Sequence, residues 1–199
     1  MCAKTLKLLA TMPDIFIIAG CNGAGKTTAA YNLLPEVFKT VEFVNADEIA
    51  RGLSPLNVDG VAFQAARIMI ERIEQLITGN KSFSFETTLS GLSYLKFIKD
   101  AKEKGYGITF FFVYLNSAEL AKSRVALRVS KGGHNIPDEV ITRRYSKGIN
   151  NFSKYALLAD DWYLYDNSAS DYQLIAKNIS GEKEISNFDL YNKISGDGN

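Results

Sequence analysis

The segment Ile15-Phe16-Ile17-Ile18-Ala19-Gly20-Cys21-Asn22-Gly23-Ala24-Gly25-Lys26-Thr27 decides how this chain folds. Its first five residues form a short apolar run, which is typical of a buried strand. Its last eight match the phosphate-loop pattern G-x-x-x-x-G-K-T. In this pattern the glycines let backbone N–H groups curl around phosphates, the lysine reaches the outer phosphates, and the threonine hydroxyl holds Mg²⁺. We therefore predict that Gly20 to Thr28 bind a nucleoside triphosphate, with Thr27 as the metal ligand.

Composition limits the classes of protein to which the chain can belong. It has 199 residues, of which 46% are hydrophobic and 23% charged, and this balance predicts one globular domain over 1–199. The formal net charge of +1 provides no overall field that would attract nucleic acid or an anionic membrane, so neither partner is expected. The longest apolar runs are too short to span a bilayer, and the N-terminus lacks a long apolar signal region. We expect a cytoplasmic protein.

Apolar runs bounded by turn residues alternate with segments of helical periodicity, which predicts an α/β fold built on a parallel sheet flanked by helices. Five strands are expected: Ile15 to Ala19, Val41 to Asn45, Ser82 to Glu86, Ile108 to Leu115 and Trp162 to Asp166. A short edge hairpin is expected over residues 172–185. The core should cover 13–168, and the polar tail 187–199 should be loose.

Signatures of two large nucleotide-binding classes are missing. A switch GTPase carries N-K-x-D for guanine, and neither Asn80-Lys81 nor Asn192-Lys193 has the aspartate. A transporter ATPase carries L-S-G-G-Q, and Leu89-Ser90-Gly91 matches only its first three positions. A small kinase or a divergent ATPase remains.

Polar residues follow the second and third expected strands, at the edge where parallel sheets place their ligands. Asp47 can accept or orient an attacking hydroxyl, or bind the metal through water. Alternatively, Asp47 caps the helix that starts at Glu48. Glu86 and Thr88 can hydrogen-bond a hydroxyl-rich substrate, or they can close the strand and cap the helix after Ser90.

Four arginines bracket a loop with two glycines. Arg124 and Arg128 share one face of a helix, and Arg143 and Arg144 follow beyond the loop. Cations that reach a transferred phosphoryl group from a mobile lid contribute much of the rate in phosphoryl transfer. We predict such a lid over about 117–150; a solvated basic face is the alternative. Adjacent helical residues point about 100° apart, so only one of Arg143 and Arg144 should face the site.

Two further positions are candidates with weaker support. His134, the only histidine, either contacts phosphate or substrate or serves local hydrogen bonding in its loop. Asp166-Asn167-Ser168 ends the last expected strand, and we predict that this segment shapes the pocket for the nucleotide base.

These pieces together resemble the zeta-toxin-like family of P-loop kinases over Ile15 to about Ser168. The matching pieces are Gly20 to Thr27, Asn45-Ala46-Asp47-Glu48-Ile49-Ala50 with Ser54-Pro55, Phe85-Glu86-Thr87-Thr88-Leu89-Ser90, the helix with Arg124 and Arg128, and Gly132-Gly133-His134-Asn135-Ile136-Pro137 leading to Arg143-Arg144-Tyr145. The P-loop alone is shared by many families, but the ordered set is specific.

The resemblance implies ATP-dependent phosphorylation of a hydroxyl; zeta toxins themselves phosphorylate UDP-N-acetylglucosamine. It would make Asp47 the residue that activates the acceptor, and it would make Lys26 with a lid arginine the groups that stabilise the phosphoryl. It would also make Glu86 and Thr88 acceptor contacts, and it implies an antitoxin partner. The chain departs from the family in one place. Where zeta toxins carry a lid arginine shortly before a proline, it has His134 before Pro137, so the charge would come from Arg143 or Arg144.

The sequence thus supports one leading hypothesis and two competitors. The leading hypothesis is a small-molecule kinase that uses ATP and Mg²⁺, with Lys26, Asp47, Arg124 and Arg128 as its catalytic residues. A regulatory ATP-binding module without acceptor chemistry is the alternative. A kinase acting on nucleic-acid ends is disfavoured by the near-neutral charge.

Overall fold

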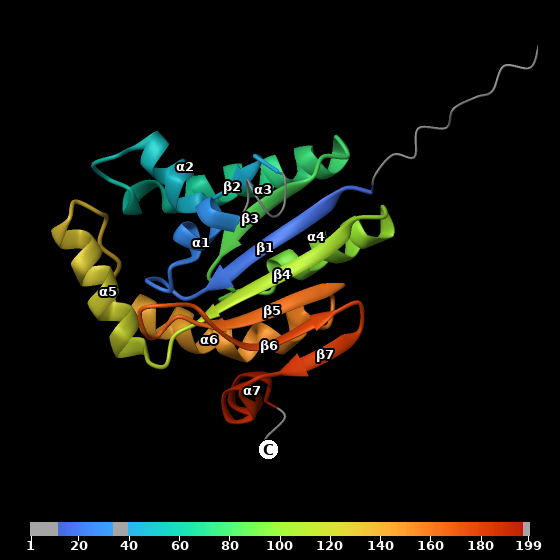
Figure 1. Ribbon diagram of the computed structural model, residues 1–199. Coiled ribbons are helices and arrows are strands. Elements are labelled where there is room, and N and C mark those ends of the chain that lie inside the picture. Colours follow the sequence, from blue (N-terminus) through green and yellow to red (C-terminus); the bar gives the residue numbers. More distant parts are fainter. Residues whose placement is uncertain (1–11, 34–39, 197–199) are drawn as a thin grey trace, which may run out of the picture.

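A computed structural model describes residues 12–33 and 40–196 of the chain. Its centre is one seven-stranded sheet in the order β2-β3-β1-β4-β5-β6-β7 (Figure 1). The strands are β1 (Asp14–Gly20), β2 (Phe43–Val44), β3 (Phe83–Thr87), β4 (Gly107–Tyr114), β5 (Asp161–Asp166), β6 (Gln173–Ile179) and β7 (Glu182–Ile185). The first five pair in parallel, as predicted, and β6 and β7 are antiparallel. The predicted edge hairpin exists, but it extends the same sheet, so the prediction of five strands was wrong.

Helices cover both faces of the sheet. They are α1 (Lys26–Leu33), α2 (Ala46–Leu53), α3 (Ala62–Thr78), α4 (Ser93–Glu103), α5 (Ala118–Ser130), α6 (Asp138–Ala156) and α7 (Phe188–Ser195), with a 3-10 turn at Asp59–Val61. The main core joins α3, α4, α6 and α7 to one face, and α1 packs on the other. In Figure 1, α4 and α6 lie behind the sheet and α1 lies in front. No helix in the described part of the chain is long and apolar enough to cross a membrane.

β1 is buried on both faces, which explains why its sequence is continuously apolar. Ile15 and Ile17 face the main core, and Phe16 and Ile18 face the cluster that contains Ala30 of α1. β1 lies between β3 and β4, and all three run in parallel. Their carboxyl ends therefore meet at one edge, where ligands of open α/β sheets bind.

The C-terminal region corrects the prediction of a loose tail over 187–199. Residues 188–195 form α7, and the side chain of its N-cap residue, Asn187, accepts a hydrogen bond from the Leu190 N–H. Tyr191 and Ile194, three positions apart on one helical face, are buried in the main core. The Tyr191 ring stacks on Trp162 with the ring centroids 6.1 Å apart. The cap and the two core side chains therefore help to hold this polar segment in place; residues 197–199 lie outside the described part.

Candidate functional site

The P-loop, residues Gly20 to Thr27, joins β1 to α1 in a conformation that depends on its glycines. Gly20, Gly23 and Gly25 have φ values of 146°, 77° and 93°, which L side chains rarely adopt. A Cβ at Gly23 would also lie 2.8 Å from the Ala121 carbonyl oxygen, because α5 packs directly against the loop. The loop ends at the N-terminus of α1, where free N–H groups and the helix dipole favour an anion. The local backbone is therefore shaped as a phosphate cradle.

A clamp from the segment after β5 holds the P-loop backbone. Asn167 Nδ2 donates to the Ala24 carbonyl at 2.8 Å, and the Tyr172 hydroxyl donates to the Gly25 carbonyl at 2.9 Å. Because C=O and the next N–H point in opposite directions across a trans peptide, these bonds direct the N–H groups of Gly25 and Lys26 away from the clamp. Sequence reasoning missed Tyr172, and it assigned Asn167 to the base pocket rather than to the loop.

Lys26 and Glu86 form a buried ion pair beneath the P-loop. Lys26 Nζ lies 3.4 Å from Glu86 Oε1, with the two side chains 6% and 8% exposed, and it donates to the Cys21 carbonyl at 2.9 Å. Glu86 Oε2 accepts from the Thr27 hydroxyl at 2.6 Å and from Asn45 Nδ2 at 3.0 Å. Because β3 lies next to β1, Glu86 contacts Lys26 and Thr27 of the P-loop as well as lining the hydroxyl cavity. A hydroxyl and a carboxylate are the hard oxygen donors that Mg²⁺ prefers, so Thr27 and Glu86 fit this metal.

Asp47 stands in the first turn of α2 without capping it. The cap is Asn45, whose side-chain oxygen accepts from the Asp47 N–H at 2.8 Å, so the alternative interpretation of Asp47 as the cap was wrong. The carboxylate of Asp47 makes no hydrogen bond or ion pair with the described part of the chain. The sequence contained the signal for this arrangement, since Asn45 followed by Glu48 three positions on is a capping-box variant.

Two cavities meet at this edge of the sheet. The P-loop cavity, of about 240 Å³, is bounded by the P-loop, Thr28, Arg124 and Arg128. The hydroxyl cavity, of about 300 Å³, lies between α2, α3, the β3–α4 segment and α6. Four residues line both cavities: Asn22, Lys26, Asp47 and Glu86. The two cavities are therefore adjacent, and groups bound in them would contact the same four side chains.

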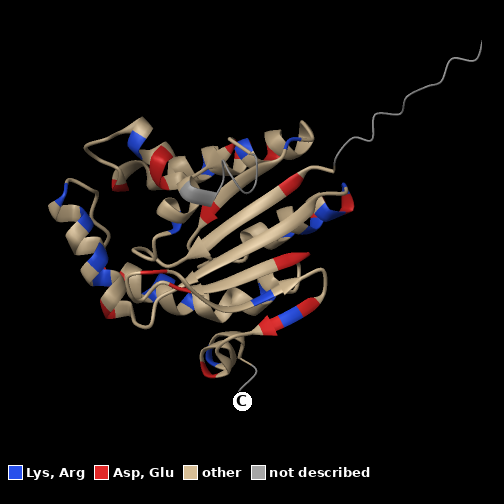
Figure 2. Cartoon of the chain, in the orientation of Figure 1, with Lys and Arg blue, Asp and Glu red and all other residues tan. Residues whose placement is uncertain are grey.

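The arginines of α5 lie on the P-loop side. Basic residues follow one another along this helix in Figure 2. Arg124 Nη2 donates to the Ala169 carbonyl at 3.3 Å, and Arg128 Nη2 donates to the His134 carbonyl at 3.2 Å. Arg128 Nε is buried and has no hydrogen-bond partner in the described chain. Both side chains line the P-loop cavity, so they add positive charge to the site where a phosphate would bind.

Arg144 and Arg143 of α6 point in different directions, as their adjacency predicts. Arg144 lines the hydroxyl cavity, and its Nη1 donates to Asn22 Oδ1 of the P-loop at 3.2 Å. Burial lowers the pKa of Arg144, and the nearby Asp47 charge opposes this shift. Arg143 is exposed. Of the two predicted substrate contacts, the structure therefore brings only Arg144 to the site.

Comparisons with known proteins identify the family. The zeta toxin family model matches residues 3–174 of the chain. This chain belongs to the zeta toxin family. An uncharacterised protein of Haemophilus influenzae is 30% identical over 140 residues, which are 70% of this chain and 97% of that protein.

Solved structures share the fold of this chain at low sequence identity. The crystal structure of AvrRxo1-ORF1:-ORF2 with ATP matches with a TM-score of 0.74 and 19% identity, over 94% of this chain and 64% of that one. This chain therefore spans less than two thirds of that relative. The PezAT chromosomal toxin–antitoxin system of Streptococcus pneumoniae matches with a TM-score of 0.70 and 16% identity, over 93% of this chain and 79% of that one.

Of the remaining predicted positions in this zeta toxin family member, His134 and Asp166 line neither cavity, whereas Thr88 lines one. His134 contributes its backbone carbonyl to Arg128, which agrees with a local role. The Asp166 carboxylate accepts hydrogen bonds from the backbone N–H and the hydroxyl of Ser168. It therefore shapes the loop after β5, and its role in a base pocket stays a prediction. Thr88 lines the hydroxyl cavity, where its hydroxyl lies 3.0 Å from that of Ser90.

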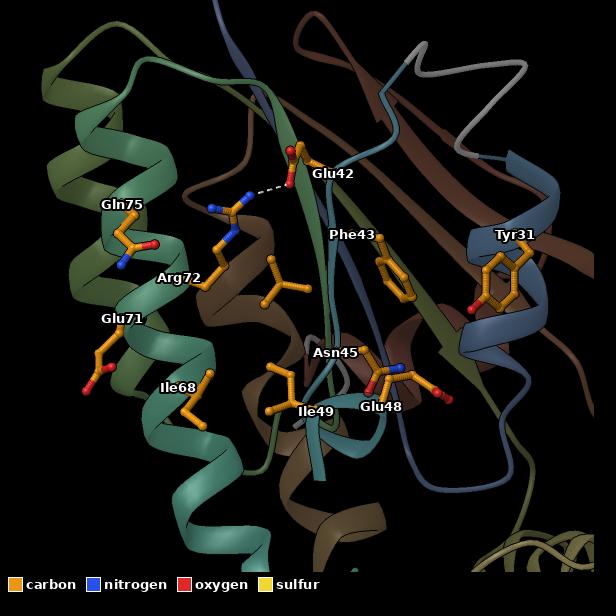
Figure 3. Close-up of a pocket in the computed structure, with 11 residues that line it drawn as sticks. Tyr31, Glu42, Phe43, Asn45, Glu48, Ile49, Ile68, Glu71, Arg72 and Gln75 are labelled. Carbon is orange, nitrogen blue, oxygen red and sulfur yellow. Dashed lines mark hydrogen bonds and ion pairs between the residues drawn. The ribbon is translucent and has the colours of Figure 1, made fainter. Parts of the chain in front are cut away.

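A third and larger cavity, of about 530 Å³, lies between α1, β2, α2 and α3. Figure 3 shows its aromatic wall of Tyr31 and Phe43 opposite α3, with Arg72 paired to Glu42 at 2.7 Å. Lys26, Asp47 and Glu86 are not among its lining residues. Cavity size is therefore no guide to the candidate site, and the side chains that can bind phosphate or accept a proton point to the two smaller cavities.

Proposed function

We propose that this zeta toxin family member is a kinase that transfers the γ-phosphoryl group of ATP to a hydroxyl of a small molecule. One observation carries the proposal: the P-loop cavity and the hydroxyl cavity share Lys26, Asp47 and Glu86. A phosphate donor and a hydroxyl acceptor bound in the two cavities would meet at these side chains. The ATP-bound structure of AvrRxo1-ORF1:-ORF2, which has the same fold, supports ATP as the donor.

In the proposed reaction Asp47 is the base. Its unpaired carboxylate takes the proton of the acceptor hydroxyl, whose oxygen forms a bond to the γ-phosphorus. The bond between the γ-phosphorus and the β–γ bridging oxygen breaks, and ADP leaves with the electron pair. Asn45 supports this role because its cap fixes the first turn of α2, on which Asp47 stands.

Cations on three elements would stabilise the charge that spreads over the transferred group. Lys26 comes from the P-loop, Arg128 from α5 and Arg144 from α6. Lys26 Nζ now contacts the Cys21 carbonyl and Glu86. To bind the outer phosphates of ATP, it would exchange these contacts for phosphate oxygens. Mg²⁺, when bound by Thr27 and Glu86, would supply charge neutralisation and fix the orientation of the phosphates.

The proposal is tested by acceptor-dependent ADP release from the purified chain with MgATP and a panel of hydroxylated compounds. Asp47→Asn keeps the size of the side chain and removes the base, so we expect a loss of about 10²- to 10⁴-fold in kcat with ATP binding retained. Glu48→Gln is the matched control, because this neighbouring carboxylate pairs with Arg51 at the exposed face of α2.

Acceptor turnover that is equal in Asp47→Asn and in the wild type would contradict Asp47 as the base. The absence of acceptor-dependent ADP release from the wild type throughout the panel, with tight ATP binding, would instead favour the regulatory ATP-binding module.

We further propose that the activity is toxic and is restrained by an antitoxin protein. The family supports this, as does the PezAT toxin–antitoxin system among the structures of the same fold. Growth arrest on expression, relieved by Lys26→Ala, is the expected result. Normal growth on expression of the wild-type chain, at a level verified by immunoblot, would oppose it.

A further inference from the structure

The β3–α4 segment, residues 88–92, carries an inference that rests on the kinase function proposed above. It contributes three lining residues to the hydroxyl cavity: Thr88, Ser90 and Gly91. We infer that α6 holds this segment in the shape that the acceptor needs, and that Asn151 of α6 is a positioning residue for the reaction. Asn151 lines neither cavity. It would act through the backbone that carries the Thr88 and Ser90 hydroxyls.

The β3–α4 segment contains a backbone conformation that is costly for its residue. Leu89 has a φ value of 57°, in the left-handed region that residues other than glycine rarely adopt. Its side chain is fully buried in the main core. The residues on either side of it, Thr88 and Ser90, both line the hydroxyl cavity, with their hydroxyl oxygens 3.0 Å apart. A conformation of this kind persists only where the surrounding structure fixes it, and it is common at ligand sites.

Two side chains of α6 hold the backbone of this segment by hydrogen bonds. Asn151 Nδ2 donates to the Leu89 carbonyl at 2.9 Å, and the Tyr155 hydroxyl donates to the Gly91 carbonyl at 2.8 Å. Asn151 is 8% exposed and Tyr155 is 1% exposed, so water competes little for either bond. The bond from Asn151 ends on the residue with the unusual φ value, which makes Asn151 the direct support of that conformation.

A glycine lets α6 approach the β3–α4 segment closely. A Cβ at Gly148 would lie 2.9 Å from the Thr88 carbonyl oxygen. Four residues share this face of α6 at spacings of four, three and four positions: Arg144, Gly148, Asn151 and Tyr155. Arg144 also donates to Asn22 of the P-loop. One helical face therefore contacts both the segment that lines the hydroxyl cavity and the P-loop, and it can fix the position of one relative to the other.

Asn151 can be changed with little effect on the shape of the core. Asn151→Asp keeps the size of the side chain and replaces the amide donor by an acceptor. Lys154 Nζ already donates to Asn151 Oδ1 at 3.4 Å, so a cation is in place to balance the charge of a carboxylate. The Leu89 carbonyl would then face an oxygen atom where it now has a donor. The substitution therefore removes the support of the β3–α4 segment and leaves α6 and its packing in place.

The experiment measures ADP release by the full chain with MgATP and two acceptor probes, UDP-N-acetylglucosamine and N-acetylglucosamine. For a probe that is turned over, Asn151→Asp should lower kcat/KM for the acceptor about 5- to 100-fold, because a buried carbonyl loses its donor. The KM for ATP should stay within about twofold, since Asn167 and Tyr172 still clamp the P-loop. Asn150→Asp, on an exposed neighbour in α6, is the matched control. An unchanged acceptor kcat/KM, or an equal change in the KM for ATP, would overturn the inference.

Gly148→Ala tests the same contact without removing a hydrogen bond. The added Cβ requires the Thr88 peptide to move, although alanine favours a helix more than glycine does. We expect the same selective loss of acceptor kcat/KM. Gly52→Ala in α2 is the matched control, because a Cβ added there meets nothing within 4 Å. Equal kinetics in these two variants would contradict a role of α6 in shaping the β3–α4 segment and would overturn the inference.

Hydrogen exchange separates this inference from the kinase proposal, because it needs no turnover. In Asn151→Asp the backbone N–H groups of residues 88–92 should exchange at least about fivefold faster than in the wild type and in Asn150→Asp, while those of the P-loop keep their rates. If neither probe yields ADP, faster exchange confined to residues 88–92 would uphold the support by Asn151 although the kinase proposal fails. Unchanged exchange there would overturn the inference whether or not the chain is a kinase.

Discussion

The two halves of the candidate site differ in how they are built. The P-loop half is built mainly on one contiguous segment, Gly20 to Thr27, which is conformationally restricted by its glycines and tied down by Asn167 and Tyr172. The hydroxyl half is assembled from α2, α3, the β3–α4 segment and α6, which are far apart in sequence. The first half is preorganised by local structure, while the second depends on how distant elements pack.

This difference has a functional meaning. Phosphate groups are common to all nucleotide-dependent kinases, so a rigid cradle suits them, whereas acceptors differ and their walls can change one residue at a time. Arg144 connects the halves, because it lines the hydroxyl cavity and donates to Asn22, one of the four residues that line both cavities. Substitution of Arg144 is therefore the strongest test of whether the two halves work together.

Arg144→Ala should have the largest effect of the three predictions that test the comparison. Removing a cation that reaches both halves should lower kcat about 10²- to 10³-fold with a smaller change in the KM for ATP. Arg143→Ala is the matched control, since that side chain is exposed on the same helix, and its kcat should stay within about twofold. Steady-state kinetics of both variants decide the matter. Equal losses would mean that the whole basic face acts, and that the halves are not linked at one residue.

Sequence reasoning succeeded where a signal is local. The P-loop pattern, the buried strand before it and the mostly parallel sheet all follow from contiguous residues, and the structure confirms them. The direction of Arg143 and Arg144 was predictable in part, since the helical repeat requires that they diverge. Only the packing of α6 against the P-loop decides which of them faces inward.

Sequence reasoning failed where the environment of a residue depends on strand order or on contacts with distant parts of the chain. The environment of Glu86 follows from β3 lying next to β1, and no local pattern states that order. Tyr172 is about 150 residues from Gly25 along the chain, so their hydrogen bond had no sequence signal. α7 was missed because its polar composition hides two core residues, although Asn187 was a readable cap. These failures all concern tertiary structure.

Cys21 should react about a hundredfold more slowly with iodoacetamide at pH 8 in the folded chain than in urea. Burial raises the pKa of this P-loop thiol from 9.0 to about 11, despite the opposing charge of Lys26, and only the thiolate reacts. Because the folded pKa is the higher one, the thiol contributes stability below about pH 9 that is lost as the pH rises towards 11. Peptide mapping by mass spectrometry separates Cys21 from Cys2. Equal rates in both states would show that the P-loop half is open rather than preorganised.

Tyr172→Phe should have the smallest effect and should act on one half alone. It deletes the hydrogen bond to the Gly25 carbonyl and keeps the ring. The clamp on the P-loop is then reduced to the hydrogen bond from Asn167 to the Ala24 carbonyl. We expect the KM for ATP to rise about two- to tenfold, with kcat and the acceptor KM nearly unchanged, because one neutral hydrogen bond positions the cradle without touching the acceptor. Tyr31→Phe, on an exposed ring of α1, is the matched control. A rise in the acceptor KM instead would mean that the clamp couples the two halves, and that the cradle is not an independent unit.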